Sequence, residues 1–268
     1  MDARRSHGVV PVALLLAVSA CHHDAAVPAA HGEDASPAAT SKARPPSPAA
    51  MTDVSAEGES FRAHAWTFVT ADVSFAIVDL GMRRTLEDAL GPGDRLAING
   101  GFFDTDGAAL GLTVSRGKRL SRFSETMSGG VFSITHGVAR VDATEDYDAT
   151  RPVDFAVQCR PRLVVAGKAN VKRSDGHGAE RTALCVREDG RIVEVVVAIP
   201  SGTDAGPSLF AMGHYLAEQL HCDDALNLDG GPSTGAAYRA ASSDAAVSRV
   251  TPRGPLRHAV VVATGDAG

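Results

Sequence analysis

The sequence of 268 residues lacks the patterns that mark several common classes of function. It contains no Cys-x-x-Cys pair and no His-x-x-x-His spacing, so no local pattern suggests a zinc site. It contains no run of Lys and Arg and no stripe of alternating basic and aromatic residues, and its formal net charge is −6. Nucleic acid is therefore not expected as a partner.

Long apolar stretches are absent except at the N-terminus. Two arginines precede an apolar stretch from Val9 to Val18, which is too short for a permanent membrane span and predicts a signal peptide over residues 1–20. The small residues before Cys21 are similar to a bacterial lipobox. We expect an exported protein with lipid on Cys21, anchored to the cell envelope, and to the outer membrane where there is one. An ordinary signal peptide with an incidental Cys21 is the alternative.

Large apolar residues are also missing after the signal peptide. Residues 22–58 contain no Leu, Ile, Phe, Tyr or Trp but five prolines, so they cannot bury enough apolar surface to offset chain entropy. We expect a disordered, Pro/Ala-rich tether over residues 21–58 and one folded domain over residues 59–268.

The folded part alternates strand patterns with one helical pattern. Leu209, Met212, Leu216 and Leu220 share one helical face, and a shorter helix is expected at 85–90. Strands are expected over 61–69, 73–79, 95–99, 111–115, 130–135, 138–142, 155–158, 162–166, 182–187, 192–198, 225–228 and 258–263. The first two are expected to pair around a short turn, as are 182–187 and 192–198. This inventory predicts an α+β fold with a mixed, mostly antiparallel sheet, one long helix and one or two short helices.

Three cysteines remain beyond Cys21, namely Cys159, Cys185 and Cys222. In an oxidising compartment they allow one disulfide and one free thiol. Their apolar surroundings allow three buried thiols just as well. The pairing stays open at this level.

Two segments combine an apolar strand pattern with a polar, glycine-rich end. They run from Leu96 to Asp104 and from Leu226 to Thr234, and each contains Asn or Asp followed by Gly-Gly. Two such strands can place two glycine loops side by side at one sheet edge, where small-molecule sites are commonly built.

Four segments, taken together, resemble the phosphodiester glycosidase family. They are Ile98-Asn99-Gly100-Gly101-Phe102-Phe103-Asp104, Gln158-Cys159-Arg160-Pro161-Arg162-Leu163, Arg181-Thr182-Ala183-Leu184 and Asn227-Leu228-Asp229-Gly230-Gly231-Pro232-Ser233-Thr234. The resemblance spans about residues 60–265, although the family more often has Gly or Ser at the position of Pro232. It implies hydrolysis of sugar-1-phosphodiesters on the glycosidic side, giving a free sugar and a phosphate monoester.

Such chemistry needs a carboxylate at the sugar centre and cations for the phosphate. Asp229 is the first candidate carboxylate and Asp104 the second, while Arg181 matches the family's arginine. Asp229 has the structural alternative of a turn-forming carboxylate, and Arg181 that of a solvated salt bridge. Asp104 is equally suited to be the paired carboxylate or a ligand of a sugar hydroxyl, and a plain turn is the alternative for Asp106. Arg160 and Arg162 are expected to be surface charges.

Further candidates are expected to bind substrate or to shape the two loops. These are Asn99, Gly100, Gly101, Asn227, Gly230, Gly231, Ser233 and Thr234. Asn99 is equally suited to orienting the sugar or to tying the loops together, and the glycines to presenting N–H groups or to permitting turns. A calcium or magnesium site on Asp104 and Asp106 is a further alternative, although the loop lacks the glutamate of an EF-hand.

Three function classes remain open on these grounds. The leading one is a hydrolase of sugar-1-phosphodiesters in envelope or extracellular phosphoglycans. The others are a non-catalytic lipoprotein that binds sugar phosphates or polysaccharide, and a metal-dependent phosphoesterase. A dense His/Asp ligand cluster, which the last would need, is not visible in the sequence.

Overall fold

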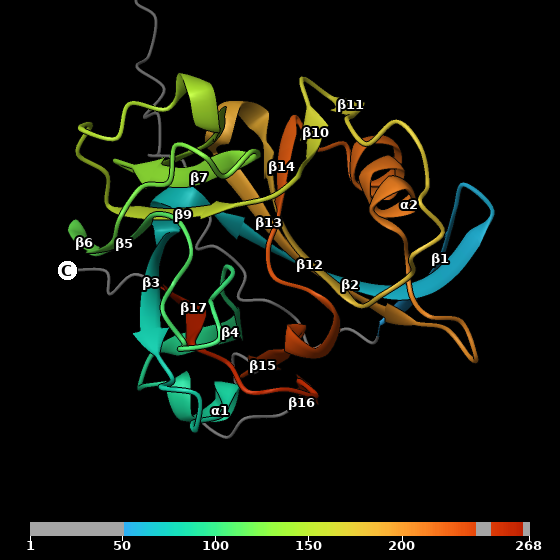
Figure 1. Cartoon of the computed structure of the whole chain (residues 1–268), viewed down its shortest axis with the longest axis horizontal. Coiled ribbons are helices and arrows are strands. Elements are labelled where there is room, and N and C mark those ends of the chain that lie inside the picture. The colour runs from blue at the N-terminus through green and yellow to red at the C-terminus, as the bar shows by residue number, and fades with distance from the viewer. Residues whose placement is uncertain (1–50, 240–247, 265–268) are drawn as a thin grey trace, which may run out of the picture. The chain divides into compact units, whose positions relative to one another are not determined.

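The computed structural model describes residues 51–239 and 248–264. The predicted signal peptide, Cys21 and most of the predicted tether lie outside the described residues. Within them, seventeen strands form three sheets, and every paired strand runs antiparallel (Figure 1). The expectation of a mostly antiparallel fold is confirmed, whereas the mixed α+β class is corrected to a β-rich fold with few helices.

The largest sheet has seven strands in the order β1-β2-β13-β12-β14-β10-β11. Their bounds are β1 Thr52–Ala56, β2 Glu59–Val69, β10 Arg162–Val165, β11 Lys168–Ala169, β12 Arg181–Arg187, β13 Ile192–Pro200 and β14 Asp224–Asn227. The β12–β13 pair is the expected hairpin, with Arg181 opposite Ala198 and Arg187 opposite Ile192.

Two five-stranded sheets complete the fold. One has the order β16-β15-β4-β17-β3, with β3 Val73–Asp79, β4 Asp94–Asn99, β15 Ala236–Tyr238, β16 Ser248–Val250 and β17 His258–Thr264. The other has the order β6-β5-β9-β7-β8, with β5 Thr113–Ser115, β6 Lys118–Ser121, β7 Gly130–Thr135, β8 Val138–Ala143 and β9 Phe155–Cys159.

The seven-stranded sheet is buried on both faces. Along β13, Val195 and Val197 join the core shared with the two smaller sheets, while Val196 and Ala198 face the cluster beneath the long helix. Successive strand residues point to opposite faces, so a strand covered on both sides needs apolar residues throughout. This explains why β13 is apolar apart from Glu194 and why β12 is almost completely buried.

The long helical segment covers one face of that sheet. It consists of α2 (Leu209–His214) followed by a π-helical turn over Tyr215–Gln219. Ser208 caps it, because its hydroxyl accepts from the amide of Ala211. Met212 and Leu216 are fully buried against the sheet, as the helical pattern predicts. The short helix α1 (Leu86–Ala89) begins with a capping box at Thr85.

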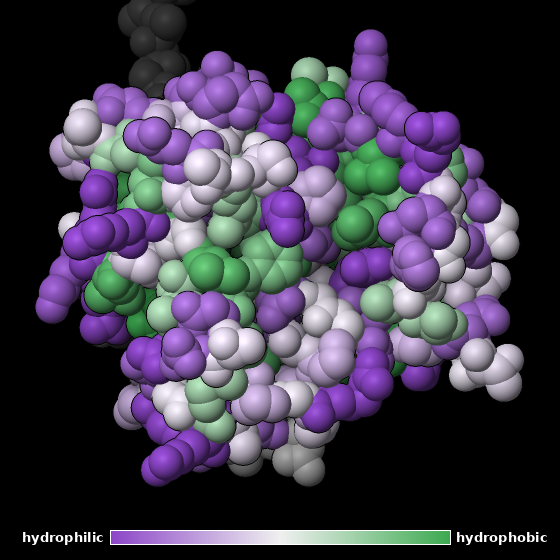
Figure 2. Space-filling view, viewed as in Figure 1, coloured by the Kyte–Doolittle hydropathy of each residue, from purple (hydrophilic) through white to green (hydrophobic). Residues whose placement is uncertain are grey.

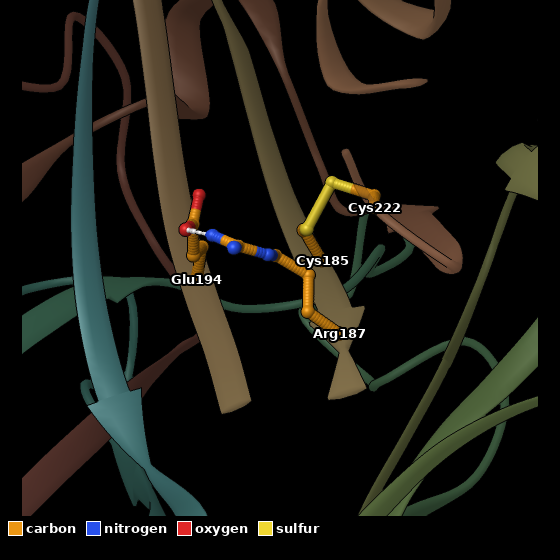
Figure 3. The surroundings of a disulfide bond; sticks show 4 residues. All are labelled: Cys185, Arg187, Glu194 and Cys222. Carbon is orange, nitrogen blue, oxygen red and sulfur yellow. Dashed lines mark hydrogen bonds and ion pairs between the residues drawn. A yellow bond between two sulfur atoms is a disulfide. The ribbon is translucent and has the colours of Figure 1, made fainter. Parts of the chain in front are cut away.

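A disulfide between Cys185 and Cys222 ties the end of the helical segment to β12 (Figure 3). Cys159 is the free thiol among the described cysteines; it is fully buried, and that burial raises its pKa to about 12. Near the disulfide, Arg187 on β12 pairs with the buried Glu194 on β13 (Figure 3). Of the two cysteine arrangements left open by the sequence, the structure takes one disulfide with one free thiol.

Two sequence-based expectations, one strand pairing and one boundary, are wrong because contacts between distant segments decide them. Strands β2 and β3 do not pair with each other: β2 pairs with β1 and β13, and β3 pairs with β17. The 3-10 turn Thr70–Asp72 carries the chain from one sheet to another instead of closing a hairpin. The tether also stops short of residue 58, because β1 lies along β2 and belongs to the folded part.

No helix among the described residues is long and apolar enough to cross a membrane. Strands β6, β11, β15 and β16, like β1, were not expected from the sequence. Each has five residues or fewer, which is too short for an alternation of apolar and polar residues to identify a strand.

The disulfide predicts a measurable contribution to stability. The bond closes a separation of 37 residues, which restricts the unfolded chain, so replacing both Cys185 and Cys222 by Ala should lower the free energy of unfolding by about 2–4 kcal/mol. Chemical denaturation of the full chain measures this, and wild type in reductant should unfold like the variant. An unchanged midpoint in both samples would show that the bond does not form in solution.

Candidate functional site

A cleft of about 770 Å³ opens where the seven-stranded sheet meets the loops after β9 and β14. Its lining comprises Phe102, Ser128, Gly129, Glu145, Arg160, Pro161, Arg162, Asn170, Ala179, Arg181, Leu209, Asn227, Asp229, Gly230 and Gly231. Three arginines and two carboxylates therefore share one cleft with the apolar Phe102 and Leu209. In the space-filling view, apolar residues gather beside α2 and in the middle of the face, with polar residues around them (Figure 2).

Asp229 is the half-buried carboxylate of this cleft. It lies two residues beyond the end of β14, and its Oδ1 accepts from the amide of Gly230 at 2.9 Å. Burial raises the pKa of Asp229, while hydrogen bonds from the Ser233 hydroxyl and the Gly230 amide lower it, and burial is the larger effect. The side chain is thus a carboxylate held in place by its own loop with part of its hydration removed.

The Asn99 side chain connects the two glycine loops and is fully buried. Its Nδ2 donates to the carbonyl of Asp229 at 2.7 Å, and its Oδ1 accepts from the Thr182 hydroxyl at 2.7 Å and from the Gly235 amide at 3.2 Å. These partners are all protein groups, and Asn99 does not line the cleft. Of its two expected roles, the structure supports the tie between loops.

The glycines permit close packing and turns. A Cβ on Gly100 would lie 2.1 Å from Cδ2 of His258, so only glycine fits over that buried ring. Burial lowers the pKa of His258 to about 4, which keeps the imidazole neutral beneath the loop. Gly101 is also buried and does not line the cleft.

Gly230 and Gly231 line the cleft, but their amides already have partners. The Gly230 amide donates to Asp229, and the Gly231 amide donates to the carbonyl of Glu180 at 2.7 Å. Gly231 also adopts a left-handed φ of 58°. These two residues therefore do not form the expected nest of free N–H groups. Positive charge to bind a phosphate in the cleft must come from side chains.

Arg181 begins β12 and is positioned by backbone carbonyls. Its Nε donates to the carbonyl of Pro207 at 3.1 Å and its Nη2 to that of His177 at 2.9 Å. Burial lowers the pKa of Arg181 below its ordinary value, but the guanidinium stays charged at neutral pH. The expected salt-bridge alternative does not describe it, since both of these bonds go to neutral acceptors.

Arg160 and Arg162 were expected to be surface charges, but both line the cleft. They flank Pro161 between β9 and β10, where the chain passes from a five-stranded sheet to the seven-stranded one. Their sequence neighbourhood carries no sign of this position, because it arises from the crossing between sheets.

Asp104 lies in its own loop and does not line the cleft. Its Oδ1 accepts from the amides of Asp106 and Ala108 at 3.0 and 2.7 Å, so its carboxylate forms a turn instead of facing the cleft. The described residues bring no third His, Cys, Asp or Glu ligand to Asp104 and Asp106, so the calcium or magnesium alternative gains no support. The second carboxylate of the cleft is Glu145, which the sequence did not single out.

Three further polar side chains of the expected set are buried in the segment that carries Asp229. Asn227 donates through Nδ2 to the carbonyls of Arg160 and Leu228, and its buried Oδ1 has no protein partner within the described part of the chain. Thr234 is buried, and its Oγ1 has no partner among the described residues. The Ser233 hydroxyl forms a hydrogen bond with the Asp229 carboxylate. Asn227 lines the cleft, but this Oδ1 is itself buried from solvent, so a ligand N–H or O–H reaches it only when a neighbouring group moves.

Comparison with protein families matches residues 93–263 to the phosphodiester glycosidase domain. The chain belongs to the phosphodiester glycosidase family. A comparison with curated protein sequences returned no match.

Solved structures give the same fold for this phosphodiester glycosidase domain. The zebrafish N-acetylglucosamine-1-phosphodiester alpha-N-acetylglucosaminidase catalytic domain, auto-inhibited by its pro-peptide, is 19% identical with a TM-score of 0.59, and the match covers 81% of each chain. A Synechocystis protein is 15% identical with a TM-score of 0.50, covering 80% of this chain and 61% of that one. A Burkholderia pseudomallei protein is 14% identical with a TM-score of 0.50, covering 76% and 74%.

The family match begins within the loop before β4, so it includes both glycine loops and every residue that lines the cleft. Strands β1, β2 and β3 precede it in sequence. β2 nevertheless pairs with β13 along its length, from Phe61 opposite Pro200 to Val69 opposite Ile192. The part that lies outside the family match is therefore structurally inseparable from the sheet that carries the site.

The buried position of Asn99 predicts a large loss of stability on truncation. Asn99→Ala would leave the Thr182 hydroxyl and the Gly235 amide buried without their acceptor, at about 1–3 kcal/mol each, so unfolding free energy should fall by about 3 kcal/mol or more. Exposed Asn170, with one bond to the carbonyl of Arg162, is the matched control, and Asn170→Ala should cost less than about 1 kcal/mol. Equal, small effects of both substitutions in urea denaturation would refute the tie between loops.

Proposed function

We propose that the protein is a hydrolase that cleaves sugar-1-phosphodiesters at the bond between the sugar C1 and the phosphate oxygen. The observation that carries the proposal is the cleft in which the half-buried Asp229 lies with Arg160, Arg162 and Arg181. A carboxylate suits a sugar centre that becomes positive, and guanidinium groups suit phosphate oxygens. Family membership supports the same reaction class.

The arginines are proposed to bind the phosphate. Arg181 is the best positioned, because two backbone carbonyls hold its Nε and Nη2, whereas its Nη1 has no protein hydrogen-bond partner among the described residues. A guanidinium held in this way binds phosphate oxygens without first losing side-chain entropy. Arg160 and Arg162 line the same cleft and supply the remaining positive charge.

The bond that breaks joins the sugar C1 to the phosphate oxygen, and its electron pair leaves with the phosphate monoester. Water supplies the new bond to C1, and its second proton passes to a base or to solvent. Asp229 is proposed either to attack C1 or to activate the water, and Glu145 is the other carboxylate available in the cleft. Since phosphate is a good leaving group, charge neutralisation by arginine takes the place of a strong general acid.

The Asn227 Oδ1 is proposed to select the sugar. It is a buried, unpaired acceptor on a residue that lines the cleft, so a small shift of this side chain on binding would let a sugar hydroxyl or amide N–H donate to it. The substrates are proposed to be phosphoglycans of the envelope or the extracellular space, encountered by a protein that is lipid-anchored through Cys21. This location rests on the N-terminal sequence alone.

Cleavage is tested with the full chain and a panel of sugar-1-phosphodiesters. Asp229→Asn should lower kcat for release of free sugar by about a hundredfold or more, because the amide neither attacks C1 nor accepts a proton. Asp104→Asn is the matched control: an amide oxygen still accepts from the amides of Asp106 and Ala108, so activity should remain near wild type.

The products separate this proposal from its alternatives. Release of sugar-1-phosphate instead of free sugar, lost on chelation, would make the protein a phosphoesterase. Tight binding of the panel with no product from wild type would make it a binding lipoprotein. Equal activity of wild type and Asp229→Asn would remove Asp229 from the mechanism.

The raised pKa of Asp229 predicts a pH profile. The ionised carboxylate is the active form, so kcat/KM should rise with pH through the pKa of Asp229, which burial places above the ordinary 3.8. Ser233→Ala removes a hydrogen bond that lowers this pKa and should move the acidic limb to higher pH. Asp104→Asn should leave the limb in place. A limb that moves to lower pH in Ser233→Ala would contradict the assignment.

A further inference from the structure

Glu57, His214 and Glu218 form a cluster away from the cleft. Glu57 lies in the turn between β1 and β2, His214 ends α2, and Glu218 lies in the π-helical turn that follows. One ligand atom from each residue lies within 4.8 Å of the other two. None of the three lines the cleft that carries Asp229.

The two carboxylates converge on one nitrogen atom. Nδ1 of His214 lies 2.7 Å from Oε1 of Glu218 and 3.1 Å from Oε1 of Glu57. A ring nitrogen carries at most one hydrogen, so it can donate to only one of two carboxylates at full strength. A cation placed among the three atoms would satisfy both carboxylates and accept the Nδ1 lone pair, which relieves this competition.

The ligand types indicate the class of cation. One imidazole nitrogen with two carboxylate oxygens is a donor set for zinc and neighbouring divalent transition metals. Calcium and magnesium prefer oxygen ligands throughout, so the imidazole disfavours them. The cluster is partly exposed, with side-chain exposures of 23%, 35% and 65% for His214, Glu57 and Glu218, which leaves room for water to complete the coordination.

The scaffold around the cluster holds the two elements together without a metal. Nε2 of Gln219 donates to the carbonyl of Ser55 at 2.9 Å, and Glu59 accepts from both the amide and the hydroxyl of Ser208 at 2.7 Å. Hydrogen bonds thus join the first hairpin to both ends of the helical segment. Ligands on elements fixed in this way lose little freedom when they bind an ion.

We propose that Glu57, His214 and Glu218 bind one divalent transition metal ion of the zinc class. The ion joins the β1–β2 turn to the end of the long helical segment and stabilises that junction. This site is independent of the proposed hydrolysis, because its residues lie outside the cleft.

Equilibrium dialysis of the EDTA-treated full chain against zinc chloride tests the site. Wild type should bind one more zinc ion than His214→Ala, which corrects for any zinc bound by the other histidines. Glu57→Gln and Glu218→Gln should each weaken binding about tenfold or more. Exposed Glu125 provides the matched control, and Glu125→Gln should bind like wild type.

Thermal unfolding gives a second measurement. Zinc should raise the Tm of wild type and Glu125→Gln but not that of His214→Ala or Glu57→Gln, since an ion that binds only the folded chain stabilises it. In EDTA, Glu57→Gln should melt like wild type, which separates metal loss from misfolding. Equal zinc content of wild type and all three cluster variants would overturn the proposal. Tight calcium binding that these variants abolish, with no zinc bound, would overturn the metal class.

Discussion

The candidate site depends on the buried amide of Asn99. This one side chain, at the end of β4, bonds to Thr182 on β12 and to the backbone of Asp229 after β14, so it joins two sheets and both glycine loops. An amide suits this place because it donates and accepts at once, and a buried group without partners would cost more than the bonds contribute. The backbone of Asp229 is therefore held by a side chain that does not line the cleft, while its carboxylate is held by the Gly230 amide and the Ser233 hydroxyl.

The cleft places charge where the surrounding packing restricts water. Asp229 is half buried and its pKa is raised, while Arg181 is held by neutral carbonyls and remains charged. Such groups interact more strongly than they would in bulk water, and they need little rearrangement as charge develops on a substrate. The apolar Phe102 and Leu209 contribute to this restriction of water.

The long helical segment connects the two places where chemistry is proposed. Leu209, its first residue, lines the cleft, and His214 and Glu218 near its other end belong to the metal cluster. The Cys185–Cys222 disulfide then fixes the chain after it to β12, the strand that begins with Arg181 (Figures 1 and 3). Arg181 itself is oriented by the carbonyls of Pro207, just before the helical segment, and His177, just before β12.

The sequence by itself determined the positions of the longer strands, the helical segment, the glycine loops and the family, because these depend on local periodicity and on residues close in the chain. Only the tertiary structure decided that β2 and β3 join different sheets, since strand partners are chosen by contacts between distant segments. It likewise moved Asp104 out of the cleft and brought in Glu145 and Arg160. It also placed Glu57 beside His214, because convergence across 157 positions leaves no local pattern to recognise.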